Sequence, residues 1–394
     1  MNQLQQKNPM DAGTVVAAAL IVSAIGSIYY NLLPLVLGAA QDYRGLDNRE
    51  IGFLGAAFFF GFNIVTISAF FWVRAVSWSM VVAVATPITA ISLYAGTLFP
   101  GYVSLLLATM IAGGAFAALY AIGTIIIGDT SNPARWYGIK IAAEAFAGAI
   151  LMLVLPGTAI ARWGFDGAVF GMIIFIILLS PFLFWIPKEG SKVQADAVQV
   201  SSKRAPQSAF IWGTLLATLI FFSAASAMWA FVERIGAQGG YDPEIIGAML
   251  SITLIAALFG SILAAVLGGR FGNMKPYSVG GVMFLMSLYL LNNAEVFTYY
   301  ATGACLLTFA IGFMLPIAIT EIAELDVDGR YVVLSVPAIG IGAMIGPGIA
   351  GVLSQSGDFQ PSLIFGAVTL IFSTILLSYA GTKARRDANA SPSA

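Results

Sequence analysis

The stretch Thr14–Leu37, TVVAAALIVSAIGSIYYNLLPLVL, carries no charge and is long enough to cross a membrane as a helix. About 20 mostly apolar residues span the hydrocarbon core of a bilayer, where every backbone polar group must be bonded within its own segment. The pattern continues along the chain, because 59% of the 394 residues are apolar and only 9% are charged. Soluble domains carry roughly a quarter charged residues. The sequence therefore predicts an all-α integral membrane protein.

Further apolar stretches of similar length bring the prediction to twelve transmembrane helices. The stretch 75–128 is charge-free and too long for one helix, so it is divided at Phe99-Pro100-Gly101. The predicted helices of the first half are 14–37, 51–73, 78–98, 102–127, 136–160 and 165–187. Those of the second half are 209–232, 245–268, 276–294, 297–320, 331–354 and 361–381.

A long polar stretch, 188–207, separates the two sets of six and is rich in Lys, Ser, Gln and Ala. This composition is typical of a linker. We therefore expect a six-helix bundle over 1–187, a cytoplasmic linker over 188–208 and a second six-helix bundle over 209–394.

The two halves also resemble each other in sequence. Asp129 and Arg135 lie just before the fifth predicted helix, and Glu324 and Arg330 lie at the same separation just before the eleventh. Gly148 has a similar counterpart in Gly342. Together these correspondences predict two pseudo-symmetric bundles that arose from one repeated unit.

The distribution of Lys and Arg predicts the orientation, because positive residues are enriched in cytoplasmic loops. One side of the twelve helices carries most of these residues: Lys7, Arg74, Arg135, Lys140, Lys188, Lys192, Lys203, Arg204, Arg270, Lys275, Arg330, Lys383, Arg385 and Arg386. The other side carries Arg44, Arg49, Arg162 and Arg234. We expect a multi-pass protein of a cell inner membrane with both termini in the cytoplasm.

This layout resembles the major facilitator superfamily, and the short basic loops after the second and eighth helices carry the likeness. The loop Leu267–Lys275, LGGRFGNMK, is similar to the family's glycine-and-arginine loop, whereas Phe71–Trp78, FWVRAVSW, keeps only the arginine. The resemblance implies a transporter in which charges at the helix ends hold one of two alternating states. The residues implied for this cytoplasmic gate are Arg74, Asp129, Arg135, Arg270, Glu324 and Arg330.

Lys140 and Glu144 are the first candidates for the functional site, because the fifth helix takes both into the membrane. They are four residues apart and therefore share one helix face. Glu144 lies nine residues beyond Arg135, which is roughly 13 Å at about 1.5 Å per residue. A bare charge at the bilayer centre costs about 2.5–3.5 kcal/mol or more, so the pair needs partners or a wet cavity. Either Glu144 carries a proton and Lys140 holds its charge or an anionic substrate, or the two form a structural ion pair.

Polar and aromatic residues inside the apolar helices form a second group of candidates. The resemblance implies that the first, fourth, seventh and tenth helices line a central cavity. The substrate contacts expected on them are Tyr30, Asn31, Tyr120, Thr124, Trp229 and Thr308. Interfacial anchoring or bonding between helices would explain the same residue types. Glu233-Arg234 at the end of the seventh helix is interpreted as a solvated helix end, with a gate at Glu233 as the alternative.

The sequence also speaks against several other classes of protein. It has no histidine and a single cysteine, Cys305, so no catalytic site, metal site or disulfide is expected. No glycine-rich turn is followed by Lys-Ser or Lys-Thr, which argues against a nucleotide site, and no cofactor is expected. The net charge of −1 gives no positive electrostatic field that would attract nucleic acid.

We therefore expect a monomeric secondary transporter, not an enzyme, whose partners are a small-molecule substrate, protons and the lipid bilayer. Alternating access around a site near the membrane midplane would drive proton-coupled uptake by symport. Lys140 favours an organic anion, and the tyrosines and tryptophans favour an aromatic compound. The alternatives are proton-driven efflux of lipophilic compounds or drugs and, less strongly supported, a membrane enzyme or sensor.

Overall fold

The computed structural model describes residues 8–99, 101–189, 208–267, 270–326 and 331–390, and within these it is helical with no β-strand. The first half contains α1 (Gly13–Asn31), α2 (Leu33–Arg44), α3 (Asn48–Trp72), α4 (Trp78–Leu98), α5 (Tyr102–Gly128), α6 (Pro133–Val154) and α7 (Ala161–Leu179). The second half contains α8 (Ser208–Gln238), α9 (Pro243–Leu267), α10 (Met274–Asn292), α11 (Phe297–Leu325), α12 (Ser335–Leu353) and α13 (Gln360–Ala390).

The predicted fold class is confirmed, with two departures in how the spans are built. In the described residues, eleven helical runs are long and apolar enough to cross a membrane. One of them, Arg135–Trp185, is 51 residues long and holds two spans. The chain turns back within it at Gly164, whose φ of +58° suits glycine because a side chain is strained there.

The first predicted span is two consecutive helices, not one. The helix α1 ends at Asn31 and α2 begins at Leu33, with Pro34 in its first turn. Proline has no backbone N–H to continue the helical hydrogen bonds. The carbonyl of Tyr30, four residues before Pro34, is therefore available to another donor.

The two halves are built around the same close helix contacts. A Cβ at Gly61 in α3 would lie 1.8 Å from the Met110 carbonyl oxygen of α5. A Cβ at Gly113 in α5 would lie 2.1 Å from the Phe58 carbonyl oxygen of α3. In the second half, Gly260 in α9 and Gly312 in α11 repeat this arrangement, at 2.2 and 2.1 Å. Because both pairs are offset by the same 199 positions (61 to 260 and 113 to 312), they support the predicted pseudo-symmetry.

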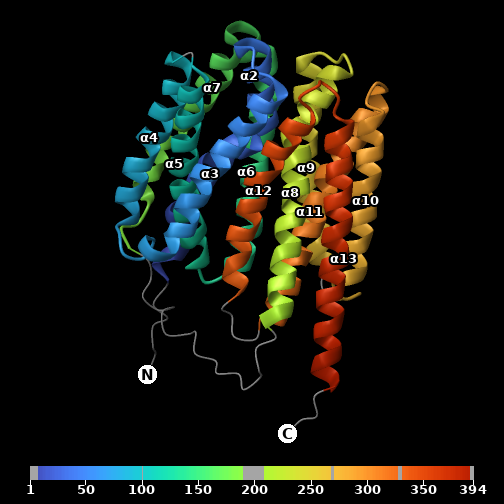
Figure 1. The fold of residues 1–394 in the computed structure, drawn as a ribbon. Coiled ribbons are helices and arrows are strands. Elements are labelled where there is room, and N and C mark those ends of the chain that lie inside the picture. Colours follow the sequence, from blue (N-terminus) through green and yellow to red (C-terminus); the bar gives the residue numbers. More distant parts are fainter. Residues whose placement is uncertain (1–7, 100, 190–207, 268–269, 327–330, 391–394) are drawn as a thin grey trace, which may run out of the picture.

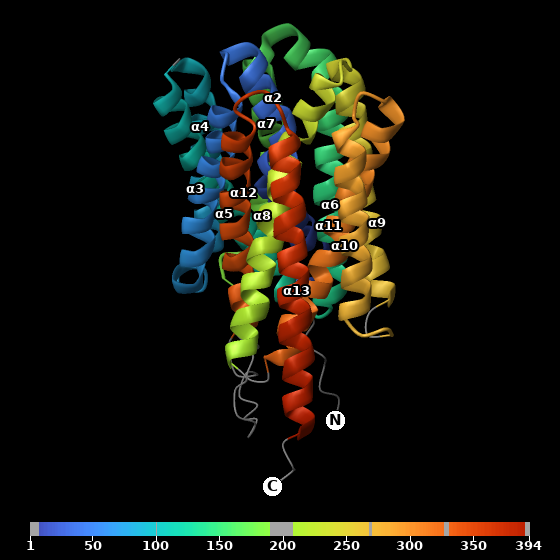
Figure 2. The same cartoon turned by 45° about the vertical axis from the view of Figure 1, so that its right-hand side comes forward.

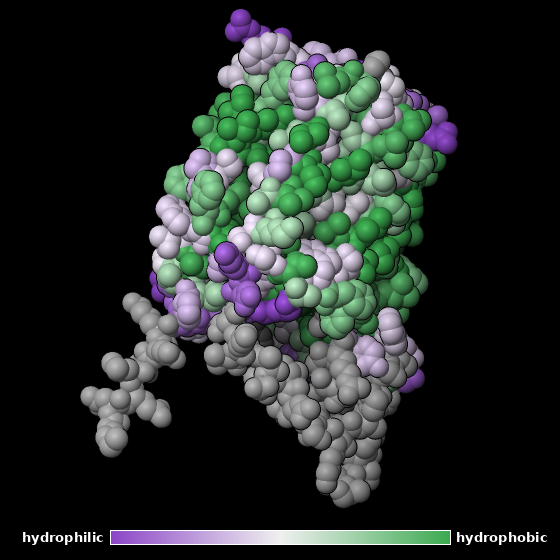
Figure 3. Space-filling model, turned by 90° about the vertical axis from the view of Figure 1, so that its left-hand side faces the viewer, coloured by the Kyte–Doolittle hydropathy of each residue, from purple (hydrophilic) through white to green (hydrophobic). Residues whose placement is uncertain are grey.

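The outer surface of the bundle suits a bilayer. Figure 3 shows one face on which apolar residues cover most of the height, with hydrophilic residues gathered toward the two ends. Large apolar side chains such as Phe70 and Phe184 are 77% and 89% exposed. Apolar exposure on this scale is expected where lipid, not water, surrounds the protein.

The two ends of the bundle differ in how the halves meet (Figures 1 and 2). We call the end where α1 begins and α13 ends the terminal end, and the opposite one the far end. Across the halves, α2 packs on α8, α3 on α12, and α6 on α9. Close contacts lie toward the far end, where Gly52 meets Pro347 and Gly247 meets Pro156.

Candidate functional site

Lys140 and Glu144 form an ion pair inside the bundle. The helix α6 begins at the terminal end and carries both side chains on one face, where Lys140 Nζ lies 2.6 Å from Glu144 Oε1. The side chains are only 2% and 9% exposed. A buried pair of this kind gains little net stability, although removing one partner alone is costly because it leaves an uncompensated charge.

Two other helices of the first half hold this pair in place. Lys140 Nζ lies 3.8 Å from the ring centroid of Tyr120 in α5, which places the cation over the aromatic face. Asn31 Nδ2 in α1 donates to the Glu144 carbonyl oxygen at 3.1 Å and to Ser27 Oγ at 3.4 Å. A desolvated cation–π contact is worth about 2 kcal/mol, so Tyr120 is a second anchor for the ammonium.

Tyr30 and Trp229 meet where the two halves face each other. Trp229 Nε1 in α8 donates to the Tyr30 carbonyl oxygen at 3.1 Å, which is the acceptor that Pro34 leaves without a helical partner. Tyr30 is 39% exposed, although Tyr29 and Asn31 beside it are buried. Part of the Tyr30 side chain is therefore accessible close to the contact between the halves.

The hydroxyl groups of the remaining predicted contacts bond to helix backbone. Thr124 Oγ1 donates to the Tyr120 carbonyl at 2.8 Å, and Tyr137 Oη donates to the Thr124 carbonyl at 3.0 Å. Thr308 is 4% exposed and donates to the Thr253 carbonyl of α9 at 2.8 Å. Their role as substrate contacts stays a prediction.

At the terminal end, Arg74 and Asp129 form a two-pronged ion pair. Both guanidinium nitrogens, Nη1 and Nη2, lie 2.6 Å from carboxylate oxygens of Asp129. The hydrogen bond to Asp129 raises the pKa of Arg74 above its usual range. Asn8 Nδ2 also donates to the Asp129 carbonyl at 2.8 Å. The contact joins the α3–α4 loop to the end of α5, so it fastens helices of one half to each other.

The other predicted gate residues have different surroundings. Arg135 is exposed, and its guanidinium lies over the Trp136 ring at 5.3 Å. Arg270 and Glu324 are also exposed, and Arg330 lies outside the described residues. The structure adds a buried contact at this end of the second half, where Asn273 Nδ2 donates to Glu321 Oε2 at 2.8 Å. Asn273, just before α10, and Glu321, near the end of α11, lie at the same end of the second half as Arg74 and Asp129 do in the first.

The interpretation of Glu233-Arg234 as a solvated helix end is wrong. The helix α8 continues to Gln238, so the two residues lie more than a turn inside it, and they are only 5% and 7% exposed. Arg234 Nη2 donates to Glu233 Oε1 at 2.7 Å. A Cβ on Gly38 of α2 would lie 2.2 Å from Glu233 Oε2, which shows how closely the two halves approach here.

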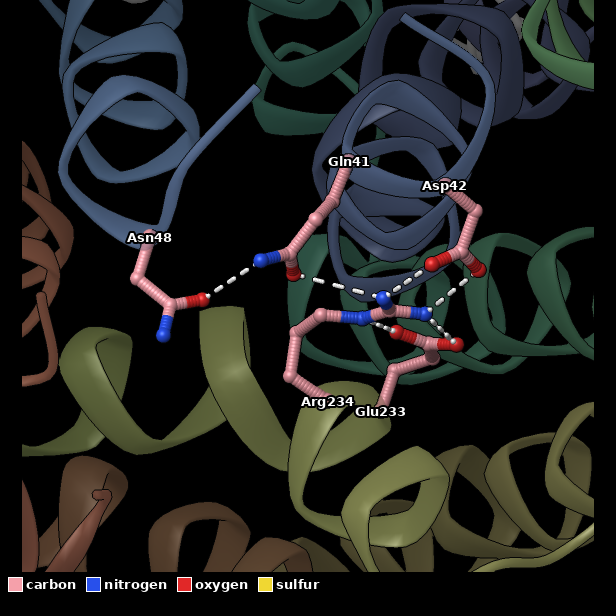
Figure 4. Close-up of polar contacts among 5 residues, drawn as sticks. All are labelled: Gln41, Asp42, Asn48, Glu233 and Arg234. Carbon is pink, nitrogen blue, oxygen red and sulfur yellow. Dashed lines mark hydrogen bonds and ion pairs between the residues drawn. The ribbon is translucent and has the colours of Figure 1, made fainter. Parts of the chain in front are cut away.

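Arg234 links the two halves at the far end, as Figure 4 shows. Its Nη1 and Nη2 donate to the carboxylate oxygens of Asp42 in α2 at 2.6 and 3.0 Å. Nη1 also lies 3.3 Å from Gln41 Oε1, and Gln41 Nε2 donates to Asn48 Oδ1 at 2.9 Å. Asn48 Nδ2 in turn donates to the Ser354 carbonyl of the second half at 2.7 Å. We call these residues, with Glu233, the far-end network.

A cleft opens where α3 and α12 separate toward the terminal end. Asn63 Nδ2 donates to the Gly340 carbonyl at 2.7 Å and joins the two helices beside it. The cleft holds about 400 Å³. Its lining is mostly apolar: Phe60, Asn63, Ile64, Ile67, Ser68, Phe71, Ile341 and Met344. Sequence reasoning did not predict a site at this place.

Comparison with known proteins gives a family match for the second half of the chain and fold matches for nearly all of it. Residues 214–393 match the family model of the Major Facilitator Superfamily. The fold matches the crystal structure of the D-xylose-proton symporter with a TM-score of 0.75 and 13% identity, covering 92% of this chain and 96% of that chain. The second half of the chain therefore matches this family's model, and the fold of the chain is similar to that of a solved transporter.

Other solved structures agree with this fold. The nucleoside transporter NupG gives a TM-score of 0.69 at 14% identity, covering 94% of this chain and 98% of that chain. The inward-facing, unoccupied structure of a bacterial homolog of the human lysosomal transporter Spinster gives 0.68 at 13% identity, covering 98% and 99%. No curated protein matches this chain in sequence. At these identities the likeness establishes the fold and leaves the substrate open.

Proposed function

We propose that this transporter is a secondary active carrier that uses the proton gradient to import a small organic anion or aromatic compound across an inner membrane, acting as a monomer. The buried Lys140–Glu144 pair is the observation that carries the proposal. It supplies one group that can take a proton and one that can hold an anion, inside a fold built to alternate.

Alternating access follows from the unequal ends of the bundle. Five pairs of described residues form hydrogen bonds across the halves at the far end or near mid-height: Asn48–Ser354, Asn63–Gly340, Trp229–Tyr30, Arg234–Gln41 and Arg234–Asp42. The excess of Lys and Arg supports a cytoplasmic terminal end. In this assignment the structure is closed to the outside, and the far-end network is the outer gate.

In this proposal, the residues near the centre of the bundle have different roles in transport. Glu144 is the proton carrier, and the positive charge of Lys140 is balanced by the Glu144 carboxylate or, when Glu144 is protonated, by the substrate anion. Tyr30, Asn31, Tyr120, Thr124, Trp229 and Thr308 are the proposed substrate contacts around this pair. The electrical gradient supplies about 2.3 kcal/mol per charge per 100 mV, and a pH gradient adds to it. Arg74 and Asp129 hold the cytoplasmic ends of the first half in register while the halves move.

Transport by proteoliposomes that contain only the purified protein tests this function. An inward proton gradient should drive accumulation of the substrate in the wild type. Glu144→Gln should abolish that accumulation and leave exchange of substrate across the membrane, because the substitution removes the proton site and leaves Lys140 to bind the substrate. Glu295→Gln, at an exposed carboxylate in the far-end loop, is the matched control and should behave as the wild type. Proton-driven accumulation that persists in Glu144→Gln would exclude Glu144 from the mechanism.

The cleft between α3 and α12 favours a second candidate, which is proton-driven efflux of lipophilic compounds. Its apolar lining includes Phe71, which is 79% exposed on the surface that faces lipid. Transport direction distinguishes the candidates, since import predicts accumulation in right-side-out vesicles and efflux predicts it in inside-out vesicles.

A further inference from the structure

We propose that the substrate is a small aromatic monoanion that replaces the Glu144 carboxylate at Lys140 once Glu144 is protonated, so that one anion and one proton cross together with no net charge. This inference rests on the proposed function and deepens it. It assigns the substrate charge, the stoichiometry and the electrical character of the transport cycle.

The surroundings of the pair require the site to stay neutral. The titratable groups that face it are hydroxyls: Tyr30 from α1, Tyr120 from α5 and Tyr137 from α6 itself. The helix α9 packs against α6, and its single charged residue, Glu244, lies beside Gly157 at the far end. Within the part of the chain that the structure describes, Lys140 and Glu144 therefore balance each other's charge, and a lone buried charge in the membrane is costly.

Two occupancies keep the site neutral while the halves move. In the empty carrier, the ammonium of Lys140 faces the Glu144 carboxylate at 2.6 Å. In the loaded carrier, Glu144 holds a proton on its carboxyl oxygen, and the negative group of the substrate takes its place beside the ammonium. One proton and one monoanion enter and leave together, so charge and atoms balance in both directions.

The geometry allows Lys140 to change partners without moving. Its ammonium lies over the Tyr120 ring and keeps that contact when the carboxylate is replaced. Asn31 bonds to the backbone carbonyl of Glu144 and not to its carboxyl group, so the protonated side chain can turn aside while α6 stays in place. An ammonium has three N–H groups, which can donate hydrogen bonds to a carboxylate or to a sulfonate.

The neighbouring rings favour an aromatic body on the substrate. Tyr30 is 39% exposed at the boundary between the halves, next to Trp229 of the second half. Aromatic pairs gain about 0.5–1.5 kcal/mol beyond the area they bury, which is an advantage for a planar ligand that stacks on Tyr30.

The test uses two probes, 4-hydroxybenzoate and benzenesulfonate, with 4-hydroxybenzamide as a neutral probe of similar size. Proteoliposomes with the wild-type protein are given a pH gradient alone or a potassium–valinomycin potential alone, and protein-free liposomes correct for passive permeation. One proton per anion predicts about tenfold accumulation per pH unit. The potential alone should drive no accumulation, and the neutral amide should not accumulate.

Variants then separate the two charges. Glu144→Gln should lose accumulation driven by the pH gradient and retain anion exchange, because Lys140 still needs an anion to cross. Lys140→Met should weaken probe binding by about thirtyfold or more, as expected for loss of one member of a buried charge pair. The double variant Lys140→Met, Glu144→Gln removes both charges, so its fold does not depend on the pair. It should bind neither anion.

Each contrary result overturns a named part of the inference. Accumulation driven by the potential alone, or about a hundredfold per pH unit, would exclude one proton per monoanion. Binding of either anion by the double variant would exclude Lys140 as its site. Failure of both anions to bind, with transport of some other solute, would exclude the substrate class and leave the proposed function standing. Absence of flux for any solute would overturn the proposed function itself.

Discussion

The far end and the terminal end of the bundle use charged residues in opposite ways. At the far end, the buried guanidinium of Arg234 in the second half binds the partly exposed carboxylate of Asp42 in the first, so this ion pair joins the halves. At the terminal end, Arg74 binds Asp129 and Asn273 binds Glu321, and each contact stays within one half. The comparison shows which contacts must break for the halves to rock and which can persist throughout.

The largest effect is expected from removing Arg234. Arg234→Ala leaves Glu233 and Asp42 facing each other without the guanidinium, and breaking a buried charge network in this way costs about 3–5 kcal/mol. The far end should open, and the melting temperature should fall. Cysteine labelling in a Cys305→Ser background would report the opening, and equal labelling of Gln41→Cys with and without Arg234 would contradict it.

A smaller effect is expected from the single hydrogen bond at mid-height. Trp229→Phe keeps the ring and removes the N–H that the Tyr30 carbonyl accepts, which should cost about 1 kcal/mol. The variant should shift the balance toward an open far end less than Arg234→Ala does. Trp212→Phe is the matched control, because Trp212 is 56% exposed on α8. An equal loss of stability in both variants would show that the hydrogen bond across the halves does not contribute to stability.

The smallest effect is expected at the terminal end. Arg74→Gln should lower stability by about 1 kcal/mol, because the Arg74 side chain is 52% exposed and the Gln amide can still donate a hydrogen bond to the buried Asp129 carboxylate, and it should not change the distance between the halves. The raised pKa of Arg74 means that its contribution is fully present below the pKa of the unfolded chain and is lost only as pH rises through the folded value. The difference in melting temperature between variant and wild type should therefore be the same at pH 6 and pH 9. A change in the distance between the halves would contradict the division between the two ends.

The transmembrane spans could be predicted from the sequence because the bilayer imposes a length and a composition on each of them. The predicted helix 78–98 has the same bounds as α4. Along most of the chain, the other predicted helix boundaries lie within a few residues of the observed ones. The helix α8 is an exception, since it extends beyond 232 to Gln238. Charges at Glu233 and Arg234 mark the end of an apolar stretch, but their partner Asp42 is 192 positions away and invisible to a local pattern.

In the candidate site too, some features could be predicted from local sequence and others could not. Local spacing placed Lys140 and Glu144 on one face, and the structure pairs them at 2.6 Å. Pro34 itself indicates the break in the first span. That the Tyr30 carbonyl then accepts a hydrogen bond from Trp229 depends on how the halves meet. The far-end network and the α3–α12 cleft arise from packing between halves, which no single stretch of sequence encodes.

The most direct test of alternating access is the pair of distances across the halves at the two ends. Spin labels at Arg49 and Gln355 report the far end, and labels at Val76 and Val336 report the terminal end, all in the Cys305→Ser background. We expect the far-end distance to lengthen and the terminal-end distance to shorten when Arg234→Ala is introduced. Two distances that stay fixed, or that lengthen together, would contradict a carrier whose halves open to one side at a time.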